Sequence, residues 1–337
     1  MSNWQDLQNN PRLKSIYETR IKVIRLIREF FWLENFVETD TPVAVRFPGQ
    51  EPYLNPVPVD IHNPNSEAAR FYLQTSPEFA MKKLLAVGFD KIFQLAKCWR
   101  DYESFGGTHN TEFTMLEWYR SPGTLVEIMD DTEKLIKFVD AKLALSKIYN
   151  LQSNYDRISV KELWQKYVDV DFNELLEINK MRDFVKSCGY QVSEEDAYED
   201  LFYKVFLNKI ESHLGKERPV FVYDYPAQMC SLSNLSQKDQ RYAERFELYI
   251  NGLELANAFG ELTNPVKQLY NLEQDQAKRQ ELGREIFGVD KDFIESLSNI
   301  PSAGGIALGV DRLVMILTEA KDINEVIFGS VADQLVN

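Results

Sequence analysis

The sequence predicts an α+β fold in which helices flank a mainly antiparallel β-sheet. Strand-like runs and long helical runs are interspersed along its 337 residues. In ERFELYINGLELANAFGEL, the dipeptide Asn251-Gly252 separates two runs of alternating polarity, and Asn-Gly favours the tight turn of an antiparallel hairpin. The glycine-rich run AGGIALG predicts a strand, followed by a helix that begins at about residue 310. We expect one domain over residues 1–337.

The first part of the chain predicts a long helix followed by short strands. Apolar residues recur at steps of three and four over residues 11–34, and Pro11 suits the first turn of a helix. Short strands and a Pro-rich loop follow, up to a helix near Ser76-Pro77, with Ser as the cap and Pro as its first residue. Residues 91–100 and 112–119 read as two further strands.

The middle of the chain, about residues 124–215, is charged and reads as mostly helical. We interpret it as an insertion into the domain and not as a separate core. RPVFVYDYP, residues 218–226, returns to strand, and the hairpin occupies residues 244–262.

The composition argues against several classes of protein. The 52 acidic and 38 basic residues give a net charge of −14, which disfavours broad nucleic-acid binding because phosphate contacts need a surplus of Lys and Arg. No apolar run has membrane-spanning length, and the N-terminal residues lack the apolar core of a signal peptide. The three cysteines have no metal-binding spacing and suggest a reducing compartment, so we expect a cytoplasmic protein.

The strand at residues 112–119 carries chemically distinct side chains on one face. Alternation puts Phe113, Met115, Glu117 and Tyr119 on that face. A ring, a thioether, a carboxylate and a phenol in a row would suit a pocket for a flat ring and a cation, or simply a polar face in water. Arg100 ends the preceding strand, and the Gly-containing loop after it is of a kind that can surround phosphates.

The hairpin brings two carboxylates together. With a two-residue turn, Glu247 pairs with Ala256, so Glu247 and Glu254 project from the same face. Like charges this close are unfavourable unless a cation lies between them. Two carboxylates together with phosphate oxygens suit Mg²⁺. The alternative is an exposed pair that water keeps apart.

The second strand of the hairpin has a further requirement. Strict alternation points Asn257, Phe259 and Glu261 to the face opposite Glu254. If these residues line the same pocket as Glu254, the strand needs a β-bulge near residues 255–256.

Two helix starts carry charged side chains. In GGIALGVDR, Arg312 lies in the first turn of a helix, where the helix dipole disfavours a cation. We expect an anion to compensate, either the carboxylate of a salt bridge or a nucleotide phosphate. In TSPE, Glu78 either balances the dipole of its own helix or faces a substrate amine.

Taken in order, these motifs resemble the catalytic domain of the class II aminoacyl-tRNA synthetases over about residues 11–330. FVETDTPV is similar to motif 1, with Pro42 at the dimer interface, KCWRDYESFGGTHNTEFTMLEWYR to motif 2, and GGIALGVDRLVM to motif 3. TSPE, HNTEFTMLEWY and ELANAFGEL resemble the lysine branch. The resemblance implies a homodimer that uses ATP and Mg²⁺.

Within that branch, two features resemble the elongation factor P–lysine ligase family more than lysyl-tRNA synthetase. The chain begins almost at the motif 1 helix, so we expect no anticodon-binding domain. Ala307 stands where lysyl-tRNA synthetases have Gly, which in the ligase family accompanies a preference for (R)-β-lysine over lysine. The implied partner is elongation factor P, whose basic face would suit the acidic chain, and tRNA is not expected to bind.

The resemblance also implies roles for individual residues. Arg100, Arg312 and Glu254 would be catalytic, and Glu247 and Glu254 would bind Mg²⁺. The nucleotide would be held by Arg100, Tyr102, Glu103, His109, Asn110, Phe113, Glu254, Leu255, Gly309 and Arg312. The amino acid would be held by Ser76, Glu78, Glu117, Tyr119, Asn257, Phe259, Glu261 and Ala307. The family usually reads Asn-Glu after the motif 2 Arg, whereas Asp101-Tyr102-Glu103 follows here in a loop about one residue longer.

The implied reaction has two steps. The carboxylate of the amino acid attacks the α-phosphorus of ATP, and the resulting aminoacyl-adenylate is attacked by a Lys ε-amino group of elongation factor P. Three other functions remain open at this point: a truncated lysyl-tRNA synthetase that charges tRNA, an amide ligase of the asparagine-synthetase type, and a non-catalytic lysine-binding regulator.

Overall fold

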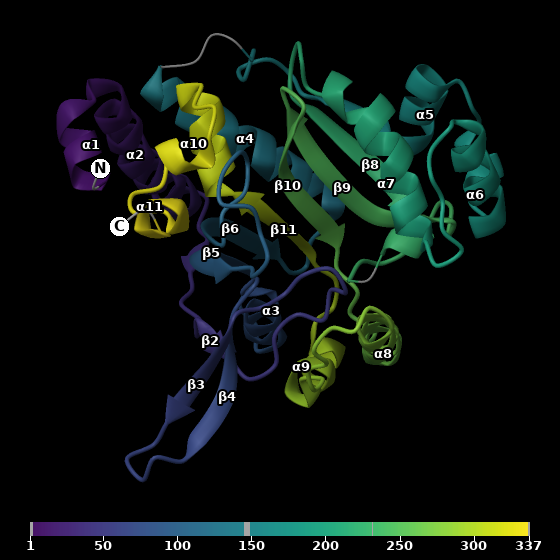
Figure 1. Ribbon diagram of the computed structural model, residues 1–337, viewed down its shortest axis with the longest axis horizontal. Helices are drawn as coiled ribbons and strands as arrows, with labels where there is room; N and C mark the ends of the chain where they lie inside the picture. The colour runs from purple at the N-terminus through teal and green to yellow at the C-terminus, as the bar shows by residue number, and fades with distance from the viewer. Residues whose placement is uncertain (1–2, 145–148, 231, 336–337) are drawn as a thin grey trace.

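An eight-stranded β-sheet forms the centre of the computed structural model, which describes residues 3–144, 149–230 and 232–335 (Figure 1). The strand order is β1-β5-β6-β11-β10-β9-β8-β7. Its pairs are antiparallel except β1–β5 and β7–β8 at the two edges, which confirms the predicted α+β fold with a mainly antiparallel sheet. The strands are β1 Val37–Glu38, β5 Lys91–Trp99, β6 Glu112–Arg120, β7 Asp156–Ser159, β8 Val220–Pro226, β9 Tyr242–Ile250, β10 Leu253–Gly260 and β11 Gly304–Gly309.

Three helices cover one face of this sheet: α2 (Pro11–Leu33), α4 (Leu125–Leu143) and α10 (Val310–Thr318). The Asn10 side chain caps α2, as the preceding helix α1 (Asn3–Asn9) ends. Side chains of these helices pack with Leu116 and Trp118 of β6 in the main hydrophobic core. Because neighbouring residues of a strand face opposite sides, Glu117 and its alternate neighbours face away from this core.

A buried ion pair joins α2 to two other elements. The guanidinium of Arg20 contacts the carboxylate of Asp311, in the first turn of α10, and donates to Thr114 Oγ1 of β6 at 2.9 Å. The second oxygen of Asp311 accepts from the Thr114 backbone N–H at 2.7 Å. Three segments far apart in the sequence are therefore fixed to one another at a single buried point.

The segment between α4 and β8 forms a second hydrophobic cluster on β8 and β9. Trp164, Phe202 and Phe206 are buried in it together with Tyr225 and Tyr249 of the sheet. The helix α4, at the start of the region that we interpret as an insertion, packs into the main core. The elements of the segment are β7, α5 (Val160–Val168), η1 (Phe172–Leu175), α6 (Ile178–Ser187), α7 (Tyr198–Lys209) and η2 (Glu211–His213).

Two of the remaining elements, η5 and α11, lie beside α2 and α10, and the others lie around the opposite face of the sheet (Figure 1). A three-stranded sheet, in the order β2-β4-β3, extends from the body of the molecule, and α3, α8 and α9 lie beside its base (Figure 1). No helix among the described residues is both long enough and apolar enough to span a bilayer. These elements are β2 Ala44–Val45, β3 Pro58–His62, β4 Ala68–Leu73, α3 Glu78–Ala86, η3 Ala227–Met229, α8 Pro265–Glu281, α9 Lys291–Ser296, η4 Leu297–Asn299, η5 Ile323–Glu325 and α11 Val331–Leu335.

Candidate active site

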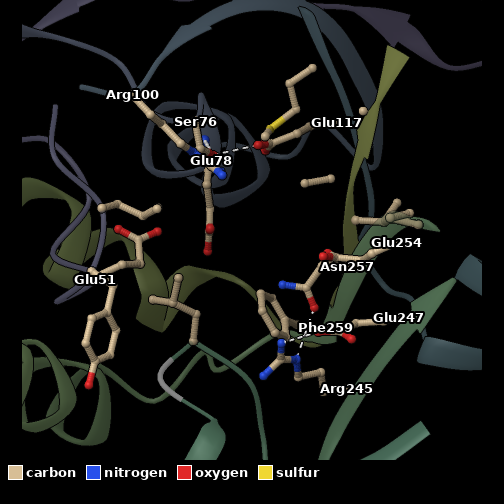
Figure 2. A pocket seen from close by; sticks show the side chains of 18 of the residues that line it. Glu51, Ser76, Glu78, Arg100, Glu117, Arg245, Glu247, Glu254, Asn257 and Phe259 are labelled. Atoms are coloured by element: carbon tan, nitrogen blue, oxygen red, sulfur yellow. Dashed lines mark hydrogen bonds and ion pairs between the residues drawn. The ribbon is translucent and has the colours of Figure 1, made fainter. Parts of the chain in front are cut away.

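A cavity of about 670 Å³ opens on the face of the central sheet that α2 and α4 leave uncovered. Its walls come from β6, β9, β10, β11, α3, α7, α8, α10, the loop before β3 and the loop between β5 and β6. Figure 2 shows side chains of β9 and β10 along one side, Ser76, Glu78, Arg100 and Glu117 along another, and Glu51 across from β10. The structure brings all the predicted site residues to this cavity except Tyr102.

Strand β6 contributes the predicted row of side chains. Phe113, Met115, Glu117 and Tyr119 all line the cavity, whereas Trp118 is fully buried in the core on the other side. The alternation read from the sequence is therefore confirmed, and the polar face is not simply solvated.

The hairpin contains the β-bulge that the predicted site required. Glu254 pairs with Tyr249 as expected, but the register shifts between Glu254 and Ala256, and Glu247 pairs with Asn257. The predicted pairing of Glu247 with Ala256 is wrong by one residue, because the bulge places an extra residue in β10. Beyond the bulge the alternation is reversed, so Asn257 and the following alternate residues line the cavity together with Glu254.

The two hairpin carboxylates share the cavity face but have different surroundings. Glu247 is buried and accepts from Tyr249 at 2.6 Å and from the side chains of Tyr225 and Arg245. The side chain of Glu254 keeps 40% of its exposure because it opens onto the cavity. Removal from bulk water, together with the charge of Glu247, raises the pKa of Glu254. A divalent cation near Glu254 would relieve this repulsion.

The described residues contain no cluster of three or more His, Cys, Asp or Glu side chains arranged to hold a metal ion. A cation at the hairpin would therefore depend on Glu247 and Glu254 and on oxygens that a ligand brings. This donor set fits Mg²⁺, which usually binds through one or two carboxylates plus substrate phosphates and water.

The end of the cavity near motif 2 and motif 3 is rich in nitrogen donors. The Arg100 guanidinium lies 5.0 Å from the centre of the Phe113 ring, and its buried Nε has no hydrogen-bond partner among the described residues. Arg312 donates to the carbonyl oxygens of Glu254 at 2.7 Å and Thr108 at 3.2 Å. Positive charge that is only partly neutralised suits an anionic ligand.

Arg312 also fixes the state of His109. Its Nη2 lies 2.9 Å from His109 Nε2, and because a guanidinium only donates, this ring nitrogen must accept. Partial burial and the charge of Arg312 lower the pKa of His109, in agreement with a neutral ring. The sequence left open whether a salt bridge or a nucleotide phosphate compensates Arg312. The Glu254 carboxylate, 3.8 Å from Arg312, forms a weak salt bridge with it.

Carboxylates dominate the part of the cavity beside the start of α3, which we call the carboxylate end. Glu117 accepts from Ser76 Oγ at 2.6 Å and from Tyr119 Oη at 2.8 Å. Burial and the nearby charge of Glu78 raise the pKa of Glu117 to about 8. Ser76 also accepts from the Glu78 backbone N–H at 3.0 Å, so it organises the start of α3, where Pro77 and not Ser76 is the N-cap residue.

Sequence reasoning missed Lys82, the cation at the centre of this end. Its side chain is 1% exposed, and its Nζ lies 2.5 Å from Glu78 Oε1 and 2.5 Å from Glu261 Oε2. Burial alone would lower the pKa of Lys82, but Glu261 and Glu78 outweigh burial and raise it. The i,i+4 spacing from Glu78 on an otherwise apolar helix face was a usable signal.

The structure adds other residues that the sequence did not indicate. Glu199 and Tyr203 of α7 and Arg245 of β9 line the cavity, as does Glu51 in the loop before β3. Their sequence motifs are unremarkable, and only tertiary packing brings them to the site. Tyr102 is the opposite case: it is 88% exposed, because the backbone turns there with a φ of 61°.

Strand β11 forms part of the cavity floor. Ala307 lies between Glu117 of β6 and Asn257 of β10 in the register of the sheet. Gly305 leaves room for the carboxylate end, because a Cβ there would lie 2.1 Å from Glu261 Oε1 and 2.3 Å from Tyr119 Cε1. The cavity can therefore hold a ligand with an anionic end, a flat ring and one or more amines.

Comparison with known proteins agrees with this geometry. The family model for tRNA synthetases class II (D, K and N) matches residues 2–330. The protein named elongation factor P–(R)-β-lysine ligase from Pasteurella multocida is 37% identical over 96% of both chains. Proteins of the same name from Edwardsiella ictaluri and Avibacterium paragallinarum are 37% identical over 98% of both chains, and 35% identical over 93% of this chain and 94% of the relative.

Proposed function

Since the chain belongs to the class II tRNA synthetases (D, K and N) and, among them, to the elongation factor P–(R)-β-lysine ligases, we propose that it performs their reaction. It activates (R)-β-lysine with ATP as an aminoacyl-adenylate and transfers the acyl group to a Lys side chain of elongation factor P. The acceptor and the amino acid follow from the names of the relatives, and the cavity supplies independent support for a diamino acid.

The observation that carries the amino-acid assignment is the charge at the carboxylate end. Glu78, Glu117 and Glu261 supply three negative charges when ionised, and Lys82 supplies one positive charge. The sum, −2, balances the charge of +2 on the two ammonium groups of β-lysine. A buried charge is stable only when it is paired, so this end favours a substrate with two amines over one with a single amine.

The other end of the cavity suits the activation step. The carboxylate of the substrate and the α-phosphate of ATP are both anions, and Arg100 and Arg312 can hold them together. Phe113, beside Arg100, offers a face for the adenine ring. Glu247 and Glu254 would hold Mg²⁺, which supplies charge neutralisation for the phosphates when it is bound.

The assignment is tested by amino-acid-dependent ATP–pyrophosphate exchange, followed by transfer to an acceptor. We expect exchange with (R)-β-lysine, and weaker exchange with lysine. We expect labelled amide on elongation factor P, none on a variant whose acceptor Lys is replaced by Arg, and none on lysine tRNA. Charging of tRNA would instead support the synthetase alternative, and the absence of exchange would refute the assignment.

We also propose that the protein is a two-fold dimer through α2 and the segment up to residue 45. Large apolar side chains in this region are exposed in the single chain: Ile21, Trp32, Leu33, Val37 and Val43. A C₂ pair would cover them. Light scattering at micromolar concentration tests this, and a monomer would contradict it. The three cysteines are free, in keeping with the proposed cytoplasmic location.

A further inference from the structure

The proposed reaction involves three amines, and the carboxylate end accounts for two of them. The two ammonium groups of the diamino acid balance the charge of Glu78, Glu117 and Glu261 after Lys82 is included. The third amine is the Lys ε-amino group of the acceptor. It arrives protonated at neutral pH, since its ordinary pKa is about 10.4, and an ammonium cannot attack a carbonyl carbon. The site therefore needs a further group that receives a proton.

We propose that Glu51 is this group: it binds the incoming acceptor ammonium and takes one proton from it. This inference rests on the proposed function. Glu51 lines the cavity, and Figure 2 shows its carboxylate across from β10, on the side of Glu78 and Arg100. Its Oε2 is buried and has no hydrogen-bond partner among the residues that the structure describes.

The loop that carries Glu51 is held in place by backbone contacts. The buried guanidinium of Arg279 donates to the carbonyl oxygens of Glu51 at 2.9 Å and Leu54 at 2.7 Å. The Asp101 backbone N–H donates to the Asn55 carbonyl at 2.7 Å, which ties the loop to the start of motif 2. The position of the loop is therefore set by its backbone contacts with α8 and motif 2.

A glycine two residues earlier leaves room for this carboxylate. A Cβ added at Gly49 would lie 2.3 Å from Glu51 Oε2, far inside van der Waals contact. The clash would be with the end of a flexible side chain, so an added methyl would move the carboxylate and leave the backbone in place.

The charges around Glu51 suit a proton acceptor. Burial raises the pKa of the Glu51 carboxyl and the negative charge of Glu78 raises it further, whereas a hydrogen bond from the Glu51 backbone and the charges of Arg100 and Arg279 act in the opposite direction with smaller effect. A general base works best when its pKa lies near the operating pH. Arg100 is also the residue proposed to hold the α-phosphate, so Glu51 lies near the acyl group that is transferred.

The transfer step then balances as follows. The acceptor ammonium gives one proton to Glu51 and becomes a neutral amine. Its lone pair forms the C–N bond to the acyl carbon, and the C–O bond to the phosphate breaks, with the electron pair leaving on AMP. The amide nitrogen loses its second proton to water, and Glu51 returns its proton to solvent.

The test uses the full-length protein with ATP, (R)-β-lysine and elongation factor P. Glu51→Gln and Gly49→Ala are compared with a control variant, Glu199→Gln, which changes a carboxylate elsewhere on the cavity wall. Exchange of pyrophosphate with ATP reports activation, which needs no acceptor. Single-turnover transfer from the preformed adenylate reports the second step. The acceptor is either elongation factor P or hydroxylamine, which is unprotonated at neutral pH and so needs no base to remove a proton before attack.

We expect Glu51→Gln and Gly49→Ala to keep exchange within about threefold of the unmutated protein and to lose about 10²-fold in transfer to elongation factor P, the usual size of a general-base effect. Transfer to hydroxylamine should be retained. In Glu51→Gln, transfer to the protein should rise about tenfold per pH unit, as free amine forms in solution. Glu199→Gln should keep the ratio of transfer to exchange.

Two results would overturn the proposal. The first is transfer by Glu51→Gln with the rate and the pH dependence of the unmutated protein. The second is a parallel loss of exchange and transfer, which would assign Glu51 to activation or to folding. Exchange that is absent in the unmutated protein would instead refute the proposed function, and the role of Glu51 with it.

Discussion

Replacing Gly305 with Ala should disable the carboxylate end of the cavity and leave the sheet intact. Gly305 pairs with Tyr119 of β6 and Phe259 of β10, and its backbone does not adopt a positive φ, so the strand itself accepts an Ala. The added Cβ would meet Glu261 Oε1 at 2.1 Å and Tyr119 Cε1 at 2.3 Å. Both groups are predicted to hold the amines of the substrate.

The size of the effect follows from the displacement. The Glu261 oxygen must withdraw by about 1.3 Å to reach the 3.4 Å at which ordinary van der Waals contact begins. A misplacement of about 1 Å commonly costs about 10²-fold in rate. Glu261 is also paired with the buried Lys82, so its withdrawal weakens an ion pair that cannot be replaced by water. We expect kcat/KM for (R)-β-lysine to fall at least about 10²-fold, and stability to fall by about 1–3 kcal/mol from overpacking.

The assay is ATP–pyrophosphate exchange at varied amino-acid concentration, with denaturant unfolding measured alongside. Gly309→Ala is the matched variant in the same strand, because a Cβ there meets nothing closer than Arg312 Cδ at 3.6 Å. It should change the KM for ATP and not the KM for the amino acid. If Gly305→Ala exchanged with unmutated parameters, Glu261 and Tyr119 would not form the amine site.

Three further predictions concern the same cavity. Ala307→Gly should raise the use of lysine relative to (R)-β-lysine at least about tenfold in adenylate formation, since one methyl in a pocket discriminates by about 1–3 kcal/mol; an unchanged ratio would exclude Ala307 as the determinant. Glu254→Ala should abolish exchange at all Mg²⁺ concentrations while the circular dichroism spectrum is kept, and exchange at the unmutated rate would remove Glu254 from the metal site. Binding of the diamino acid, measured by calorimetry, should strengthen and release protons as pH rises from about 6 to about 8, because Glu117, with a pKa of about 8, must ionise. The ligand-free protein should lose stability over the same range, since a carboxyl whose pKa is raised binds more protons in the folded than in the unfolded state, and an affinity independent of pH would contradict this.

The order of the strands and helices could be predicted wherever a local pattern determined it. Alternation in residues 112–119 correctly separated the cavity face of β6 from its core face, and Asn251-Gly252 correctly marked the hairpin turn. The bulge near residues 255–256, which the structure confirms, could be predicted only as a condition, because the sequence does not show that Asn257 lines the same pocket as Glu254. The pairing of Glu247 was therefore misplaced by one residue.

The site residues that were missed depend on tertiary structure. Glu199 and Tyr203 reach the cavity only because α7 packs against β8 and β9, and no motif marks them. The spacing of Lys82 from Glu78 is that of a helical ion pair, but only the tertiary structure brings Glu261 to it. Tyr102 was predicted to hold the nucleotide but is exposed outside the cavity. Resemblance fixes the position of a residue in a motif but not the path of a longer loop.

Through the contact of Arg20 with Asp311 and Thr114, the long helix α2 helps to hold the walls of the cavity in place. Asp311 immediately precedes Arg312, and Thr114 immediately follows Phe113, so α2 braces both walls of the proposed nucleotide end through one buried side chain. In the proposed dimer, a subunit whose α2 is no longer covered by its partner would retain every reacting group. Its Phe113 and Arg312 would be held less firmly, and the deficit would appear as weak ATP binding with a nearly normal rate at saturation.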